Sequence, residues 1–189
     1  PATTYTFTLV ASNVLGPSPE SVALDVDTCA EEPDALAAAP TFAAATTSSI
    51  TVAWSTPDYD NGAAISKYLV TATPGGATAE TSDASTSMTV DNLTPGVAYT
   101  FTVKAYNGVM RGVDGDCAAE GGSGWGPESA SSAAMYTKPV KPAAPSTVSL
   151  HSDAQGTSLT VDWDRPYYNG ANITNYTVYS NASAGGAAM

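Results

Sequence analysis

The sequence predicts an all-β protein built from repeated two-sheet sandwich domains, and two observations support that prediction. The first is the stretch from Leu93 to Asn107, where apolar residues stand at every second position: Tyr99, Phe101, Val103 and Ala105. Such alternation is typical of a strand with one face in a core and the other in solvent. The second is a very similar stretch from Pro1 to Asn13. The same element is therefore used more than once.

The spacing between matching residues measures the repeat. Trp54 and Trp163 lie 109 residues apart (163 − 54), whereas Tyr5 and Tyr99 lie 94 apart (99 − 5). The 15-residue difference is the extra length of one loop in the middle repeat. A module of roughly 94 residues, with about seven short strands and no helical periodicity, has the size and pattern of a two-sheet sandwich.

Three repeats divide the chain. Residues 1–29 are the C-terminal part of one domain, residues 30–138 are a complete domain, and residues 139–189 are the N-terminal part of a third. Because the chain begins inside a repeat, we expect it to be a piece of a longer one, with both end domains completed by chain outside it or by another copy. Alternation and turn residues predict strands over residues 4–13, 21–28, 49–54, 65–72, 86–90, 99–107, 129–137, 157–163 and 173–178.

The charge balance excludes two classes of partner. Six Lys and Arg against 18 Asp and Glu give a net charge of −12, which repels nucleic-acid phosphates and anionic lipid headgroups. The acidic surface either keeps the protein soluble by like charge or collects divalent cations. No apolar run approaches the ~20 residues that span a bilayer. We therefore expect no nucleic-acid partner and no membrane insertion of this segment.

Residues that could carry catalysis or bind a cofactor are sparse. His151 is the only histidine, and it is expected on a strand of the incomplete third domain with no glycine elbow beside it. Zinc spacings, phosphate-binding loops and dinucleotide fingerprints do not occur. Asp114, Asp116 and Glu120 could offer oxygens to calcium, but the run lacks the fuller spacing of a calcium loop. The sequence thus predicts no enzyme, no catalytic residue, no bound metal and no cofactor.

Several motifs recur in a fixed order. They are a Trp that ends an alternating strand and is followed by Pro, an Ile-x-x-Tyr-x-Val strand, a Leu-x-Pro-x-x-x-Tyr corner, and a Gly-Pro before the last strand. The residues are Trp54, Pro57, Ile65, Tyr68, Val70, Leu93, Pro95, Tyr99, Gly126 and Pro127, with Trp163, Pro166, Ile173, Tyr176 and Val178 in the third repeat. In this combination, over essentially its whole length, the chain resembles the fibronectin type III family.

The resemblance implies tandem immunoglobulin-like (fibronectin type III) β-sandwiches. It places six residues in the cores: Trp54, Tyr68, Leu93, Tyr99, Trp163 and Tyr176. It also implies a tyrosine corner, in which the Tyr99 hydroxyl bonds back to the backbone near Leu93. A buried tyrosine needs such a partner for its hydroxyl.

The middle repeat departs from the family pattern by an insertion at residues 108–124, where the first repeat has only Val14 and Leu15. In the family topology this loop joins strands F and G, at the same pole as the N-terminus of the domain. The resemblance therefore implies that Cys117 pairs with Cys29, stapling the loop to the preceding linker, although two unrelated thiols remain the alternative.

Two candidate contact residues belong to this region: Arg111, within the insertion, and Trp125, directly after it. Trp125 is flanked by glycines, and it either folds back on its own domain or anchors a partner. Arg111 begins the run Arg-Gly-Val-Asp, in which an extra Val breaks the integrin-binding tripeptide of some family members. Integrin binding is therefore not inferred.

Four N-glycosylation sequons support an extracellular or cell-surface location: Asn92, Asn172, Asn175 and Asn181. We expect a non-catalytic structural or adhesive segment of a multidomain protein, which acts as a spacer and contacts other protein chains or further copies of the array. Two alternatives remain open at this point. They are an accessory spacer of a secreted carbohydrate-active enzyme and a receptor ectodomain.

Overall fold

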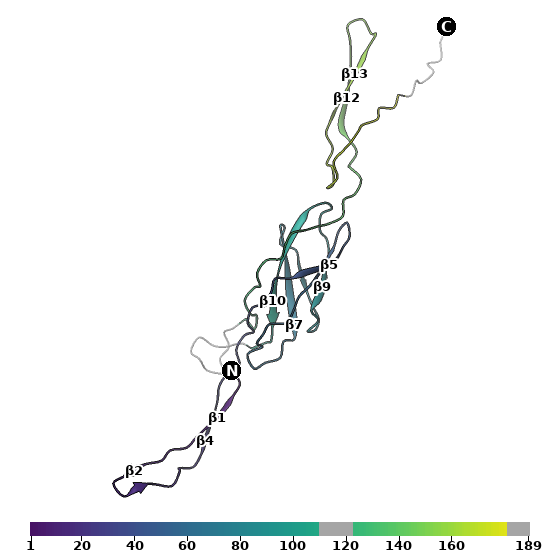
Figure 1. Cartoon of the computed structure of the whole chain (residues 1–189). Helices are drawn as coiled ribbons and strands as arrows, with labels where there is room; N and C mark the ends of the chain where they lie inside the picture. Colours follow the sequence, from purple (N-terminus) through teal and green to yellow (C-terminus); the bar gives the residue numbers. More distant parts are fainter. Residues whose placement is uncertain (110–122, 181–189) are drawn as a thin grey trace. The chain divides into compact units, whose positions relative to one another are not determined.

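The computed structural model describes residues 1–109 and 123–180. Within those residues every regular element is a β-strand. Contacts divide the chain into two compact units, Pro1–Lys138 and Pro139–Met189. The first unit holds an N-terminal hairpin and a complete middle domain, and the second holds a further hairpin (Figure 1).

Two antiparallel sheets form the middle domain. One has the strand order β5-β6-β9 and the other has the order β11-β10-β7-β8. The strands are β5 (Thr41–Ala45), β6 (Ile50–Ala53), β7 (Lys67–Thr73), β8 (Thr78–Glu80), β9 (Ser87–Val90), β10 (Ala98–Tyr106) and β11 (Met135–Tyr136). None of the predicted ranges covers β5 or β8. The latter is a three-residue strand that pairs with β7 after the Gly75-Gly76 turn. This order of short antiparallel strands is that of an immunoglobulin-like sandwich.

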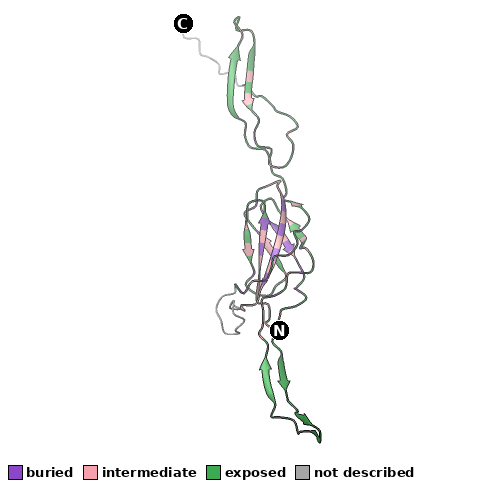
Figure 2. Ribbon diagram, turned by 90° about the vertical axis from the view of Figure 1, so that its left-hand side faces the viewer, coloured by how far each residue is buried: buried purple, intermediate pink, exposed green. Residues whose placement is uncertain are grey.

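The core lies between these two sheets and follows the alternation of the sequence. On β10 the odd-numbered residues are buried and the even-numbered ones are partly exposed. On β7 the even-numbered residues are the buried ones, as they are on β6, which contributes the opposing wall of the core. Buried residues gather in this domain, whereas the strands near both ends of the chain are mainly exposed (Figure 2). The core residues include Ile50, Val52, Trp54, Tyr68, Val70, Ala72, Leu93, Tyr99, Phe101, Val103 and Ala105.

The N-terminal hairpin is less regular than the sequence predicts. Strands were expected over residues 4–13 and 21–28, but the paired strands are only β1 (Thr4–Phe7) with β4 (Leu24–Asp27), and β2 (Ser12–Asn13) with β3 (Gly16–Pro17). Between them, Ser18 and Ser21 donate their backbone N–H groups to Ala11 and Leu9. Between these two contacts the chain advances by three residues on one side of the hairpin and by two on the other. A regular ladder of backbone hydrogen bonds is therefore interrupted.

The same mismatch shortens the last strand of the middle domain. A strand was expected over residues 129–137, but only β11 (Met135–Tyr136) forms. Upstream of it, the backbone N–H groups of Ser129 and Ser132 donate to the carbonyls of Val103 and Phe101. Here too the chain advances by three residues on one side and by two on the other. The segment stays attached to β10 without forming a continuous ladder.

The second unit contains one described sheet, β12 (Ser146–Ser152) paired with β13 (Leu159–Asp164). The strand predicted over residues 173–178 is not formed, because no strand of the described chain lies beside it to complete its backbone hydrogen bonds. Its Tyr176 ring lies 5.1 Å from the Trp163 ring. Trp163 is half-buried, whereas Tyr176 remains 42% exposed and is not a core residue here.

Candidate functional site

The linker before the middle domain is held by a side chain from the loop between β6 and β7. Asn61 Nδ2 donates to the Glu32 carbonyl at 2.8 Å and to Asp34 Oδ1 at 3.0 Å. In return, Glu31 N–H donates to the Asn61 carbonyl at 3.0 Å. Asn61 has a φ of 57°, a conformation that asparagine adopts more readily than most residues. The Asn-Gly turn therefore holds the linker in place through these hydrogen bonds.

A second asparagine holds the same linker from the end of β10. Asn107 Nδ2 donates to the Glu31 carbonyl at 2.7 Å and to the Asp60 carbonyl at 3.0 Å. Its Oδ1 accepts the Val109 N–H at 3.0 Å. Asn107 therefore ties the start of the insertion to both the linker and the neighbouring loop.

Glu32 of the linker binds the other end of the insertion. Its Oε1 accepts hydrogen bonds from Ser123 N–H at 2.8 Å, Ser123 Oγ at 3.1 Å and Gly124 N–H at 3.1 Å. Charged acceptors make stronger hydrogen bonds than neutral ones. Gly126 follows, and a Cβ there would come within 2.2 Å of the Pro33 carbonyl oxygen. The loop can approach the linker this closely only with glycine at that position.

The second unit repeats the attachment made by Asn61. We call the hydrogen bonds between Asn61 and linker residues 31–34, together with their counterparts in the second unit, the linker clamp. Asn169 Nδ2 donates to the Lys141 carbonyl at 2.7 Å, and Val140 N–H donates to the Asn169 carbonyl at 3.2 Å. Asn169 also has a positive φ, 51°. Ala143 N–H donates to the Tyr167 carbonyl, as Asp34 N–H does to the Tyr59 carbonyl. The same backbone contacts thus recur 108 to 109 residues later.

Trp125 packs on its own domain. Its backbone forms an isolated bridge with Tyr106, and the two rings lie 4.9 Å apart. Lys67 Nζ lies 4.6 Å from the Tyr106 ring centroid, and Lys104 Nζ lies 5.2 Å from that of Trp125. Lys67 also pairs with Glu80 at 2.6 Å. Trp125 is thus packed against the outer face of the β10–β7 sheet and remains half-exposed.

The four predicted core residues of the middle domain are all buried: Trp54, Tyr68, Leu93 and Tyr99. The Tyr99 hydroxyl accepts the Thr94 N–H at 3.0 Å, so the corner closes one residue after Leu93. The Trp54 and Tyr68 rings meet edge to face with centroids 5.3 Å apart. Burial raises the pKa of the Tyr68 hydroxyl.

Other predicted residues fall at exposed positions or outside the described chain. Asn92, Asn172 and Asn175 are exposed, which is compatible with modification. Cys29 is partly buried at the start of the clamped linker. The described residues do not include Cys117, Arg111, Asn181 or the acidic run Asp114, Asp116 and Glu120.

Sequence reasoning missed the hydroxyl residues that attach the last segment to β10. Ser132 N–H donates to the Phe101 carbonyl while Phe101 N–H donates to Ser132 Oγ. Ser129 does the same with Val103, and Thr137 with Val97. Each hydroxyl replaces the carbonyl that a regular ladder would provide. The available signal was the three-residue spacing of serines, which Ser18 and Ser21 share.

The structure offers little chemistry beyond these contacts. No group of three or more His, Cys, Asp or Glu residues in the described ranges is arranged to hold a metal ion. His151 lies exposed on β12, with Nδ1 3.1 Å from Asp162 Oδ2. The described chain also contains no helix with the length and apolar character to span a membrane.

Comparison with known proteins identifies the fold of the middle domain. Residues 38–114 match the family model for the fibronectin type III domain. The crystal structure of chicken CNTN1 FN1-FN3 domains is 18% identical and covers 73% of this chain and 42% of that chain, with a TM-score of 0.41. A crystal structure of titin domains is 23% identical and covers 70% of this chain and 40% of that one, with a TM-score of 0.43. The chain thus spans about two fifths of each structure's length, and the predicted all-β, fibronectin type III fold is confirmed.

Proposed function

We propose that the protein is a non-catalytic spacer and protein-contact segment of an extracellular or cell-surface protein, built from tandem fibronectin type III domains. The observation that carries this proposal is the linker clamp. It recurs around Asn61 and Asn169, where each side-chain amide donates to a linker carbonyl and each backbone carbonyl accepts a linker N–H. A domain whose only task was to fold would not need its incoming linker fixed. A spacer does, because domains joined by a free linker move relative to one another by default.

The chain between the two units is short and anchored within each of them. Lys138 N–H donates to the Thr46 carbonyl at 2.7 Å in the first unit. Val140 N–H donates to the Asn169 carbonyl in the second unit. Only Pro139 stands between these two amides, and its ring fixes φ. The chain on each side of Pro139 is thus held by its own unit.

The proposal includes a disulfide between Cys29 and Cys117. Cys29 begins the clamped linker, and both ends of the insertion are tied to that linker through Asn107 and Glu32. Closing so long a loop stabilises a fold by roughly 4 kcal/mol. Peptide mapping without reduction should recover the two cysteines in one linked fragment. Alkylation of both thiols in native protein would contradict the bridge.

Glycans at Asn92, Asn172, Asn175 and Asn181 are the second part of the proposed extracellular setting. The first three are exposed in the described chain, so attachment would not disturb the core. Intact-mass measurement on native material should show hexosamine. A mass without hexosamine would remove this support for secretion.

The spacer role is tested by the order of the joint. Residual dipolar couplings should give alignment tensors of similar magnitude for the two units, because a joint with limited bending aligns both together. Asn169→Ala removes the side-chain clamp on Lys141 and should reduce the tensor of the second unit. Asn172→Ala, at an exposed position, is the control and should not. Independent tensors in the unmodified protein would contradict the spacer proposal.

A further inference from the structure

Three asparagines hold linkers in this structure, and glycine follows each of them. Asn61 and Asn169 belong to the linker clamp, and Asn107 ties the linker before the middle domain to the insertion. These asparagines also form the three Asn-Gly pairs of the whole sequence. The five other asparagines are followed by residues that carry a Cβ. Linker attachment and the Asn-Gly pair therefore coincide throughout this chain.

The Asn-Gly pair is chemically reactive, because glycine has no side chain to shield its backbone nitrogen. That nitrogen can attack the asparagine Cγ, which forms an N–Cγ bond and breaks the Cγ–Nδ2 bond. Ammonia leaves with the proton of the glycine N–H, and a five-membered succinimide ring remains. Water then opens the ring at either carbonyl and gives aspartate or isoaspartate. The net change replaces an amide by a carboxylate, with water as the co-reactant.

The linker clamp occupies both reacting groups of the Asn61-Gly62 pair. Asn61 Nδ2 donates to the Glu32 carbonyl at 2.8 Å and to Asp34 Oδ1 at 3.0 Å. The Gly62 N–H donates to Asp60 Oδ1 at 3.0 Å. Moving the Asn61 side chain onto the Gly62 nitrogen breaks these bonds. The reaction therefore requires the clamp to open locally.

We propose that Asn61 is a deamidation site controlled by the linker clamp, and that its conversion releases the linker irreversibly. The carboxylate that replaces the amide has no N–H to donate to the Glu32 carbonyl. It also stands beside the Asp34 carboxylate, which accepts from the amide at 3.0 Å, and like charges this close repel each other. This inference goes beyond the spacer function, because it depends only on hydrogen bonds within the first unit.

The hydrogen bonds on each asparagine amide give the expected order of reaction. Asn61 Nδ2 has two acceptors. Asn107 Nδ2 also has two, and its Oδ1 accepts the Val109 N–H. Asn169 Nδ2 has one acceptor among the described residues, the Lys141 carbonyl. An amide with fewer bonds is released more easily, so Asn169 should react fastest and Asn107 slowest.

Peptide mapping of the folded chain, produced without glycans and incubated in mildly alkaline buffer, measures the rate at each asparagine. Asn61 should convert to aspartate and isoaspartate, whereas Asn92 should not, because Leu93 follows it despite a similar φ of 60°. Asp34→Ala removes one acceptor of the Asn61 amide and should speed its conversion by roughly fivefold, as for the loss of one hydrogen bond. Asp58→Ala is the matched control, since it removes an exposed charge from the loop that carries Asn61.

Two results of this experiment would overturn the proposal. Equal rates at Asn61 in the Asp34→Ala and Asp58→Ala variants would contradict control by the clamp. Conversion of Asn61 only after denaturation of the chain, and in no folded variant, would contradict a modification site in the folded protein.

The release of the linker is tested with Asn61→Asp, which places the product carboxylate at this position. The Glu31 N–H donates to the Asn61 carbonyl and the Asp34 N–H donates to the Tyr59 carbonyl, and both amides should exchange with solvent severalfold faster in the variant. Asn92→Asp is the matched control, because it makes the same substitution at an exposed position of positive φ. Unchanged exchange at both amides would overturn the release.

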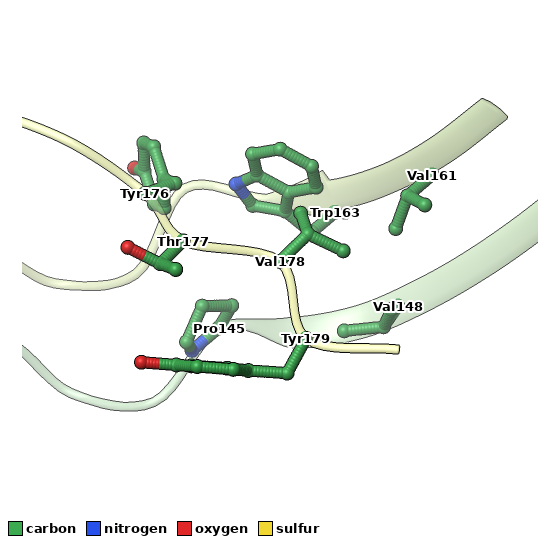
Figure 3. A pocket seen from close by; sticks show the side chains of 8 residues that line it. All are labelled: Pro145, Val148, Val161, Trp163, Tyr176, Thr177, Val178 and Tyr179. Carbon is green, nitrogen blue, oxygen red and sulfur yellow. The ribbon is translucent and has the colours of Figure 1, made fainter. Parts of the chain in front are cut away.

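The second unit provides a check that release differs from unfolding. Asn169→Asp should speed the exchange of the Val140 N–H, which donates to the Asn169 carbonyl. Trp163 lies with Tyr176 and Val178 around an open apolar hollow of about 270 Å³, which the Asn169 turn does not line (Figure 3). The indole proton signal of Trp163 should therefore stay in place. A shift of that signal would overturn a release confined to the clamp.

Discussion

Ser132 and Phe101 exchange two hydrogen bonds, although their backbones do not form a regular ladder. Ser132 N–H donates to the Phe101 carbonyl, and Phe101 N–H donates to Ser132 Oγ, both at 2.9 Å. Both residues are buried. The side chain of Ser132 thus satisfies a core amide that water cannot reach.

Ser132→Ala should lower the free energy of unfolding by about 1–3 kcal/mol, because the Phe101 N–H would be buried without an acceptor. Urea denaturation followed by tryptophan fluorescence measures the change. The neighbouring Ser131 is exposed, so Ser131→Ala should leave the midpoint unchanged. Equal stability of the two variants would show that the Ser132 hydroxyl does not stabilise the buried Phe101 amide.

Tyr99→Phe should destabilise the middle domain by about 0.5–1.5 kcal/mol. The change removes only the hydroxyl that accepts the Thr94 N–H at 3.0 Å and keeps the buried ring. Tyr136, which is exposed, provides the control substitution Tyr136→Phe. Thermal unfolding should separate the two variants, and identical melting temperatures would contradict a corner latched by this hydroxyl.

Trp125→Ala should destabilise the domain by about 1–2 kcal/mol, since it removes an aromatic pair and exposed cation–π contacts. These are the contacts with Tyr106, Lys67 and Lys104. A double-mutant cycle with Tyr106→Ala should give a coupling energy that reports the ring contact. Additive effects of the two substitutions would contradict the packed position of Trp125.

Glu32→Gln should loosen the base of the insertion. The substitution removes the charge that accepts hydrogen bonds from Ser123 and Gly124. Amide hydrogen exchange at Ser123 and Gly124 should become faster, whereas Glu20→Gln, at an exposed position of the N-terminal hairpin, should leave it unchanged. Unaltered exchange in both variants would mean that Glu32 does not hold the loop.

The turn between β12 and β13 should open in acid. Hydrogen bonds from the Thr157 side chain, followed by those from the Ser158 and Thr157 backbone, lower the pKa of Asp153 to about 2. A carboxylate whose pKa is lower when folded stabilises the turn above its ordinary pKa of 3.8 and loses that effect as pH falls toward 2. Proton chemical shifts of the Thr157 amide should follow this titration. Asp153→Asn should remove the pH dependence, and its persistence would contradict the assignment.

The alternation of apolar residues was enough to predict most strands and the core of the middle domain. Phe101, Val103 and Ala105 are buried because a strand sends every second side chain to the same face, and this period is visible in the sequence. The predicted strand over residues 173–178 had the same pattern but did not form. An alternating pattern specifies a face, whereas a strand also needs a neighbour for its backbone.

By itself the sequence determined the all-β class, the repeat and the buried faces, because these depend on local periodicity and on matching residues. The tertiary structure decided the linker clamp, the serine attachments and the position of Trp125. Asn107 reaches Glu31 across 76 residues, and Ser132 reaches Phe101 across 31. Such contacts depend on how the sheets and loops are placed in space. The residue pattern within a single strand or loop does not predict that placement.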